Sequence, residues 1–468
     1  MAEARLSDKM GRQLIKIQIN RGGMTMKFSN KVLIFMALTL FISLGTVSRG
    51  IASDVTVKVG AAFDITGPYS DLGMLRAFQD CIRWTNEEGG FKDVKGNTCK
   101  IKLVWQDCQS NIPKGMAAYK DFKAQGCVVH FYSSTGQNFA LKKRGVKDKI
   151  PFISQLVSNI VYEGKDSWIY STSGGQRESA IQALDGFKQV LPKVFKKDRP
   201  PKIGFMGWNN IIGEDYVPFA RAYAKKLGFE TGPDVYFSMK ALDVSPQLRT
   251  LADAKCDYSF LSMAGGQEAM VLKNRYNMGL HEKLKFLLMS PSVVAWATIK
   301  HMEPKYYNGN LLAFIYATQH DNSWGSNLMI DLQKKYHKGD VMWDLFEDYS
   351  IGFNNTYFTM KVIELALKTV PGDKLTGADI MKYGLNKVKI TDTKGLAMGF
   401  DCTLYPGNRN PTTGGRVFEQ RDGKLVRLTD WIPNKYQAPY SPTAPQWVKD
   451  SQKELMEFMK KKKAKKKK

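Results

Sequence analysis

Apolar and polar residues alternate at residues 55–59, where valines are interleaved with Thr56 and Lys58. A period of two is typical of a strand with one buried face. Small and polar residues follow at 64–68, and apolar residues at helical spacing begin near Leu72. The pattern predicts a strand–turn–helix unit, and ligands of open α/β sheets lie outside the carboxyl ends of such strands.

Further strand and helix patterns follow at βαβ spacing in two series. In the first series we expect helices at 72–88 and 113–125 and strands at 101–106, 127–132 and 151–153. In the second we expect helices at 177–191 and 216–227 and strands at 202–207, 257–262 and 285–289. An amphipathic helix at 349–369 and short strands between 403 and 431 come last. Two α/β series in tandem predict two lobes.

The charge of the chain is concentrated at its ends. Of the formal net charge of +25, residues 460–468 contribute +8 and residues 1–53 contribute +6, which leaves +11 for the body between them. A moderately basic body attracts anionic solutes, but it is not by itself a nucleic-acid footprint. We therefore expect no nucleic-acid partner.

Residues 26–52 have the features of a secretory signal peptide. They combine a lysine-bearing start, an apolar run at 32–47 and a small-residue end, with cleavage expected near Ala52 or Ser53. The apolar run has 16 residues, fewer than the roughly 20 of a spanning helix. An uncleaved anchor is the alternative. We expect a periplasmic protein and interpret residues 1–23 as an over-long start, ahead of a signal peptide at 24–52.

The stretch VTVKVGAAFDITGPYSDLG at 55–73 resembles the opening of the periplasmic branched-chain amino-acid (leucine/isoleucine/valine)-binding proteins, the solute receptors of ABC importers. The resemblance extends by pattern order to about residue 431. It implies the type I periplasmic binding protein fold, α/β, with two Rossmann-like lobes joined by a three-crossover hinge. Lobe 1 would comprise 54–172 plus about 311–395, and lobe 2 would comprise 173–310 plus about 396–435.

Residues 436–468 differ in composition from the rest of the chain. Prolines and polar residues lead into a short helix-like stretch and then the lysine run. We expect a disordered, solvated tail. The alternative is a weak electrostatic contact with an anionic membrane surface, to which each lysine adds roughly 1 kcal/mol.

The six cysteines offer no zinc or redox motif, because none stands in a C-x-x-C pair. One or two disulfides would suit an oxidising periplasm. The related leucine receptors have a disulfide that starts at a position matching Cys108. The position of its partner cysteine is Tyr132 here, so we do not expect that disulfide in this chain. The pairing stays open among Cys81, Cys99, Cys108, Cys127, Cys256 and Cys402.

Enzymatic motifs are absent from the sequence. There is no P-loop, no H-E-x-x-H and no G-x-S-x-G, and the five histidines lack metal-ligand spacing. Asp64 and Asp107 end adjacent predicted strands and could pair as acid and base, or each could cap a turn. We expect a protein without catalytic activity, cofactor or metal.

Hydroxyl groups follow two strands of the first lobe. Ser133, Ser134 and Thr135 come after one strand and just before a helix, and the turn at 154–158 repeats the arrangement. Free N–H groups and hydroxyls together suit a carboxylate. The resemblance implies that Ser133, Ser158 and the Leu156 backbone hold the ligand's carboxylate, and a register slip would replace Ser133 by Ser134. Gln155 lies in the same turn.

The second lobe departs from the amino-acid receptors. The glutamate that neutralises the ligand's ammonium there corresponds to Ser292, and aromatic positions correspond to Ile212 and Ala264. An unpaired ammonium in a closed cleft is unfavourable, so an ordinary α-amino acid is not expected. Trp208 could stack on a flat ligand or pack in the core. Tyr69 and Tyr349 are further residues expected to line the cleft.

These features predict a periplasmic solute-binding protein of an ABC importer. It would capture a small organic solute between the lobes, a carboxylate, amide-like or aromatic compound, and deliver it to a membrane permease. The alternative is a ligand-sensing receptor module for a membrane signalling partner, since the same architecture serves both purposes.

Overall fold

The computed structural model describes residues 54–67, 72–154, 158–163, 167–172, 174–263, 266–289, 302–314, 318, 321–340, 346–390, 395–396, 402–403, 414–436, 438–439, 441 and 443–465. The chain divides into two compact units, Met1–Ala52 and Ser53–Lys468. All described residues belong to the second unit. None of the described helices combines the length and hydrophobicity needed to cross a bilayer.

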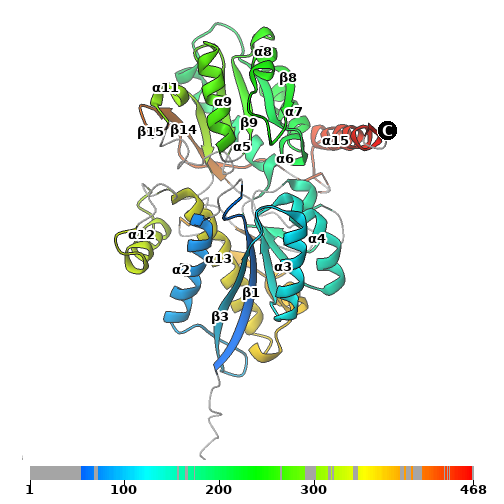
Figure 1. Ribbon diagram of the computed structural model, residues 1–468, viewed down its shortest axis with the longest axis vertical. Coiled ribbons are helices and arrows are strands. Elements are labelled where there is room, and N and C mark those ends of the chain that lie inside the picture. Colours follow the sequence, from blue (N-terminus) through cyan, green and yellow to red (C-terminus); the bar gives the residue numbers. More distant parts are fainter. Residues whose placement is uncertain are drawn as a thin grey trace, which may run out of the picture. The chain divides into compact units, whose positions relative to one another are not determined.

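The first sheet is built around β1 (Asp54–Phe63), whose residues 59–63 are all buried. A strand buried on both faces is typical of a parallel sheet covered by helices. The strand order is β2-β3-β1-β4-β5-β6 (Figure 1). The other members are β2 (Phe91–Lys92), β3 (Thr98–Asp107), β4 (Val129–Tyr132), β5 (Phe152–Ser154) and β6 (Ile169–Ser171). All pairs are parallel except β2 with β3, so the carboxyl ends of the other strands meet at one edge.

Helices on the first sheet include α2, α3, α4 and α13 (Figure 1). Their bounds are α2 (Leu72–Glu87), α3 (Ile112–Ala124), α4 (Thr135–Asp148) and α13 (Phe346–Leu367). Helix α12 (Trp324–Tyr336) contacts α2 and α13. α3 begins at Asn111, whose side chain accepts a hydrogen bond from the Lys114 N–H, as N-cap residues do. Helix α13 packs on α2, so a late part of the chain returns to the first lobe.

The second sheet has the order β15-β14-β11-β10-β9-β7-β8, with β16 beside β14. Its members are β7 (Lys202–Trp208), β8 (Glu230–Phe237), β9 (Tyr258–Ser262), β10 (Lys285–Met289), β11 (Leu311–Phe314), β14 (Gly414–Arg421), β15 (Lys424–Arg427) and β16 (Ile432–Pro433). Strands β7 to β11 pair in parallel, and β14 returns antiparallel to β11. The chain thus crosses back to this lobe after α13.

The remaining elements connect or cover these sheets. They are η1 (Asn159–Val161), α5 (Gln176–Val194), α6 (Ile211–Glu214), α7 (Val217–Lys226), α8 (Ser245–Asp253), α9 (Gly266–Asn277), α11 (Pro304–Tyr307), η3 (Gly372–Lys374), α14 (Gly377–Asp379), η4 (Ile380–Leu385), β12 (Lys389–Ile390) and β13 (Cys402–Thr403). Gly213 lets α6 turn tightly after β7, because a Cβ there would collide with the carbonyl oxygen of Trp208.

The two-lobe α/β architecture expected from the sequence is confirmed. Strand β10 coincides with the expected strand at 285–289. One lobe boundary shifts: β11 belongs to the second sheet, so the crossover expected near residue 311 lies after Phe314.

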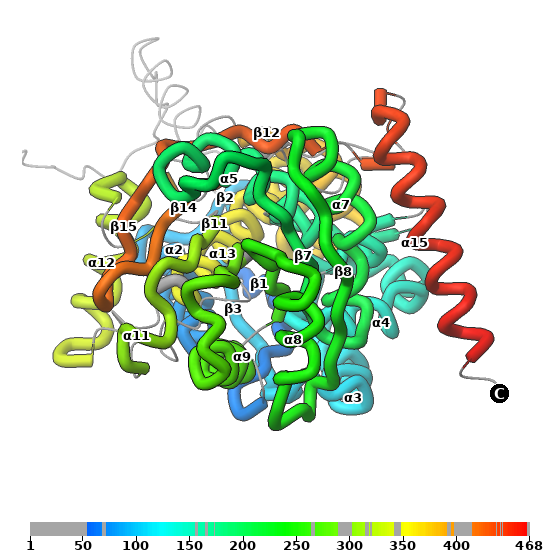
Figure 2. Tube along the Cα trace, turned by 90° about the horizontal axis from the view of Figure 1, so that it is seen from above, coloured from blue at the N-terminus to red at the C-terminus, as the bar shows by residue number. Residues whose placement is uncertain are grey.

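The predicted disordered tail is wrong for residues 446–465, which form the helix α15 (Gln446–Lys465) (Figure 2). Val448, Ser451 and Leu455 recur at helical spacing and are buried. Val448 and Leu455 pack with Phe219 of α7 in a small apolar cluster. The apolar stripe is narrow, and the many lysines around it concealed it in the sequence.

The disulfides expected from the six cysteines are not formed by the five whose side chains are described. Cys81, Cys99, Cys108, Cys127 and Cys256 are buried free thiols. Burial raises the pKa of the Cys108 and Cys256 thiols to about 11. These thiols therefore remain protonated and unreactive at neutral pH.

Candidate functional site

The turns after the parallel strands of the first sheet form the candidate site. β1, β3 and β4 end at Phe63, Asp107 and Tyr132, and each leads into small and polar residues. Parallel strands place such turns side by side at the carboxyl edge, where α/β proteins bind their ligands.

Asp107, at the end of β3, is hydrogen-bonded to the turn that follows β1. It accepts hydrogen bonds from the Ile65 N–H at 3.0 Å and from the Thr66 hydroxyl at 2.5 Å. Burial alone would raise the pKa of Asp107, but these bonds and the Gln109 N–H outweigh it and lower the pKa. Asp107 is therefore an ionised turn-forming group.

Asp64 has a comparable role on the other side of the same turn. It is fully buried and accepts a hydrogen bond from the Ser110 hydroxyl at 2.5 Å. Asp107 thus stabilises the backbone of these turns and Asp64 holds the Ser110 side chain, so each acid has a structural role.

The turn after β3 adopts an unusual backbone conformation. Gln109 and Ser110 are consecutive non-glycine residues with φ of 52° and 51°. The Gln109 side chain holds this shape, donating to the Thr66 hydroxyl at 2.5 Å and accepting from Lys114 Nζ at 2.5 Å. Left-handed backbone at non-glycine residues is unfavourable and concentrates at functional sites.

Ser133, Ser134 and Thr135 lie where β4 passes into α4. Ser134 is the N-cap residue of α4, yet its side chain makes no capping hydrogen bond. The Thr135 hydroxyl accepts from the Ser158 N–H at 3.3 Å, which brings the two hydroxyl-rich turns together. A helix N-terminus with spare hydroxyl groups is suited to an anion.

Ser158 already binds a carboxylate that the chain itself supplies. Its hydroxyl and the Asn159 N–H each donate to Asp215 Oδ2 at 2.7 Å. Arg177 donates to Asp215 Oδ1 through Nη2 at 2.5 Å and Nε at 3.1 Å. The Ser158 hydroxyl, which was expected to hold the ligand's carboxylate, is therefore hydrogen-bonded to Asp215 of the second lobe instead.

Arg177 carries the positive charge of this buried group. It is fully buried, pairs with Glu163 at 2.5 Å and stacks on Phe219 with its guanidinium carbon 4.1 Å from the ring centre. Burial alone would lower the pKa of Arg177, but Asp215 and Glu163 raise it well above its usual value. Because Glu163 and Asp215 come from different lobes, the group joins them.

Trp208, at the end of β7, is a core residue. It is 1% exposed, and its Nε1–H donates to Gln267 Oε1 at 2.5 Å. It belongs to one apolar cluster with Phe63 and Phe131 of the first sheet. Of the two readings left open for Trp208, packing describes the structure. Ile212 is half-buried in the first turn of α6, and its N–H donates to Asn210 Oδ1 at 3.0 Å.

Tyr349, expected to line the cleft, lies instead in the core of the first lobe. It is fully buried with apolar side chains of α2 and α13. Its hydroxyl donates to Asp80 at 2.8 Å, and Asp80 also contacts His337 Nε2 at 2.8 Å. These contacts account for Tyr349 without a ligand.

Five further predicted residues fall outside the described part of the chain. They are Tyr69, Gln155, Leu156, Ala264 and Ser292. In the described part, no group of three or more metal-ligating side chains comes together.

Glu268, in the first turn of α9, was not singled out in the sequence. It is fully buried, and both carboxyl oxygens lack a hydrogen-bond partner within the described structure. Burial raises the pKa of Glu268 well above its usual value, so the carboxyl is held neutral. An acid in a first helical turn ordinarily interacts with the helix dipole, so its position in the sequence does not indicate a buried carboxyl.

The fold and these turns define a two-lobed α/β binding protein. A sequence profile of the periplasmic binding protein family matches residues 56–424. The chain belongs to the periplasmic binding protein family, whose members are solute-binding proteins rather than enzymes. No curated protein matches the chain.

Solved structures similar to this chain include several ABC-transporter proteins. One is a branched chain amino acid ABC transporter protein from Thermus thermophilus with bound valine (18% identity, 85% of this chain and 98% of that chain, TM-score 0.65). Another is a solute-binding protein from R. palustris in complex with 4-hydroxybenzoate (20% identity, 81% of this chain and 98% of that chain, TM-score 0.64). A third is a substrate-binding protein from Aeropyrum pernix (16% identity, 85% of this chain and 99% of that chain, TM-score 0.70). At these identities the likeness establishes the fold.

Proposed function

We propose that this protein is the solute-binding component of an ABC importer and holds a small organic solute between its lobes. The observation that carries the proposal is the match to the periplasmic binding protein family over 56–424. The carboxyl-edge turns of the first sheet, with the strained backbone at Gln109 and Ser110, supply the polar surface that such a role needs.

We assign the ligand's anionic group to the turn after β4. The hydroxyls of Ser133 and Ser134 and the N–H groups at the start of α4 are the donors there. Ser158 is the weaker candidate, because Asp215 occupies its hydroxyl. The proposed solute is a carboxylate, amide-like or aromatic compound, a class that includes the 4-hydroxybenzoate bound by the R. palustris neighbour.

Ordinary α-amino acids fit this site less well. The position that matches the ammonium-binding glutamate of the amino-acid receptors is Ser292. Glu268, the buried acid near the end of β9, is held neutral and so attracts an ammonium group only if it first loses its proton. The neighbour with bound valine makes amino acids a necessary part of any ligand screen.

The proposed location is the periplasm, reached through the signal peptide at 24–52, and the proposed protein partner is a membrane permease. A weak membrane contact is also proposed for α15. Its lysines at 449, 453, 460, 461 and 463 are exposed, and anionic lipid attracts such a basic surface.

A thermal-shift screen of the chain from Ser53 to Lys468 tests the proposal. The panel contains aliphatic and aromatic carboxylates, amides, urea and the common amino acids. A true ligand at 100 to 1,000 times its dissociation constant should stabilise the protein by roughly 3–4 kcal/mol. Stabilisation by a carboxylate or aromatic compound supports the proposal. Stabilisation by amino acids alone overturns the ligand class, and no stabilisation by any compound overturns solute binding.

A further inference from the structure

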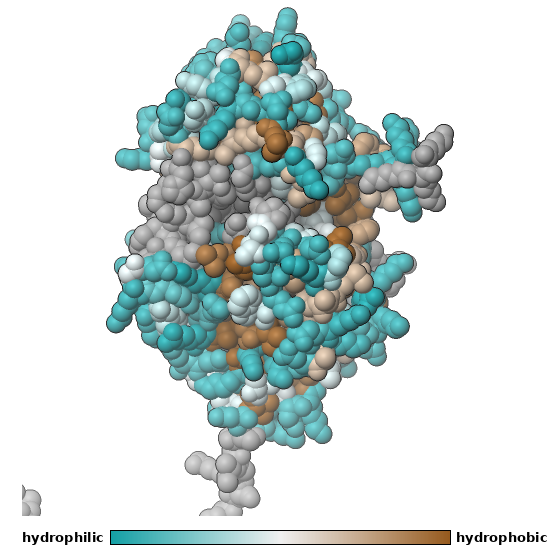
Figure 3. Space-filling view, viewed as in Figure 1, coloured by the Kyte–Doolittle hydropathy of each residue, from teal (hydrophilic) through white to brown (hydrophobic). Residues whose placement is uncertain are grey.

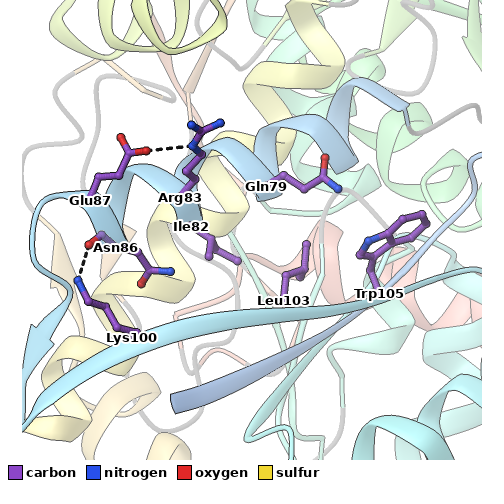
Figure 4. Close-up of a pocket in the computed structure, with 8 residues that line it drawn as sticks. All are labelled: Gln79, Ile82, Arg83, Asn86, Glu87, Lys100, Leu103 and Trp105. Atoms are coloured by element: carbon purple, nitrogen blue, oxygen red, sulfur yellow. Dashed lines mark hydrogen bonds and ion pairs between the residues drawn. The ribbon is translucent and has the colours of Figure 1, made fainter. Parts of the chain in front are cut away.

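A groove of about 580 Å³ lies between α2 and β3, on the flank of the first lobe (Figure 4). Ile82, Leu103 and Trp105 form its apolar part. The Trp105 side chain is 42% exposed. Apolar patches are visible over this region of α2 and β3 (Figure 3). The groove is distinct from the turns at the carboxyl edge, because all the residues that line it belong to α2 and β3.

Backbone groups of β3 face outwards beside this groove. The Cys108 N–H bonds to Phe63 O of β1, so even-numbered residues of β3 point towards β1. Odd-numbered residues point away, because backbone groups alternate along a strand. Strand β2 pairs with β3 only at Thr98 and Cys99. In the described part of the chain, no strand pairs with β3 on this side beyond Cys99.

Asn86 of α2 shows what this edge accepts. Its Nδ2 donates to Ile101 O at 2.8 Å, and its Oδ1 accepts from the Ile101 N–H at 2.8 Å. One side-chain amide thus makes the pair of bonds that a neighbouring strand would make. The next outward-facing residues, Leu103 and Trp105, are those whose side chains line the groove. An exposed strand edge of this kind is a template for pairing with another chain.

We propose that an extended, acidic segment of another protein binds here, adding a strand at Leu103 and Trp105 and placing apolar side chains against Ile82. Its acidic residues would face the basic side chains at the rim of the groove, Arg83 and Lys100, and the exposed Lys102 on the strand beside it. Strand addition of this kind takes affinity from backbone hydrogen bonds and specificity from alternate side chains.

The charged side chains around the groove favour an acidic partner. The carboxylate in the rim, Glu87, is held by Lys335, Tyr336 and Arg83, which lower its pKa to about 2. Lys102 is exposed on the strand itself, and Lys100 is half-buried beside the groove. Two copies pairing through β3 would bring these lysines together, and like charges on paired strands are destabilising. An acidic partner therefore fits better than a second copy.

A labelled peptide, acetyl-Glu-Val-Glu-Val-Glu-amide, is the probe, and fluorescence anisotropy with the chain from Ser53 to Lys468 is the measurement. We expect saturable binding below about 1 mM, and weaker binding of the peptide with Lys in place of Glu. N-methylation of the amides that face β3 should weaken binding about tenfold, since each methyl group removes a hydrogen bond to the strand edge. N-methylation of the other amides should leave it unchanged.

Protein variants locate the site without disturbing the core. Lys102→Glu should weaken the Glu peptide and strengthen the Lys peptide, while the control Lys120→Glu, on an exposed position of α3, should change neither. Equal effects of both sets of N-methyl groups, or no saturable binding, would overturn the proposal. A dimer in sedimentation equilibrium that Trp105→Ala abolishes would overturn the acidic partner and assign the edge to a second copy.

Discussion

Several side chains that the sequence predicts to bind the ligand instead stabilise the folded protein. Ser158 and Asp215 are 57 residues apart in the chain and lie in different lobes, so no local pattern links them. Trp208 and Tyr349 each stand near a strand end or in a helix, and their burial depends on contacts with distant elements. Sequence reasoning located the hydroxyl-rich turns, but it could not decide which hydroxyls the protein itself uses.

The Arg177–Asp215 pair should be essential for stability. Asp215→Asn removes the negative charge and leaves a buried guanidinium with Glu163 as its remaining carboxylate partner. Breaking a buried pair in this way typically costs about 3–5 kcal/mol. Urea unfolding of the variant should show that loss. Ser158→Ala, which removes one hydrogen bond to the same carboxylate, should cost only about 1 kcal/mol, and an equal loss in both variants would contradict the role assigned to the ion pair.

Glu268 should make stability depend on pH. The pKa of its carboxyl is raised in the folded state, so below the unfolded pKa of about 4.3 both states are protonated and no penalty arises. As the pH rises above that value, the unfolded chain releases the proton and the folded protein retains it, so stability falls. Glu268→Gln should therefore stabilise the protein at pH 7, where the unfolded chain has released the proton, and change its stability little at pH 4.

Chemical denaturation of Glu268→Gln at both pH values checks this. The control is Glu457→Gln, an exposed residue of α15, which should have a small effect at either pH. A Glu268→Gln variant that is less stable than the original protein at pH 7 would show that the carboxylate has a stabilising partner.

At the scale of elements, strongly periodic segments were predictable. The central strands and the helices α2, α3 and α13 follow the expected positions closely, because their apolar patterns are long. Strand β8 was missed since its Gly232-Pro233-Asp234 sequence is typical of a turn. Helix α15 was expected only as a short helix-like stretch within a disordered tail, because its buried stripe is a few residues wide and gains its burial from α7.

Helix α15 should contribute measurably to folding through that stripe. Leu455 is fully buried, whereas its neighbour Met456 is 41% exposed. Leu455→Ala should lower the free energy of unfolding by about 2–5 kcal/mol, as core truncations do, and Met456→Ala should change it by less than about 0.5 kcal/mol. Thermal and urea unfolding of the two variants measure this. Similar, small effects would show that α15 is not docked in solution.

At the scale of the whole molecule, we propose that the two α/β lobes hold a small solute at the carboxyl edge of the first sheet. The architecture followed from the sequence because parallel strands and their helices leave a clear periodic signal. The ligand did not, since several candidate residues lie in turns whose contacts depend on both lobes.

Titration calorimetry with the compound that gives the largest thermal shift tests this location of the ligand. Ser133→Ala combined with Ser134→Ala should weaken binding by roughly 1–3 kcal/mol for each charge-assisted hydrogen bond lost. Ser158→Ala should leave the affinity nearly unchanged, because Asp215 already occupies that hydroxyl. Unaltered affinity in the double variant, together with a large loss in Ser158→Ala, would place the ligand's anionic group at Ser158 instead.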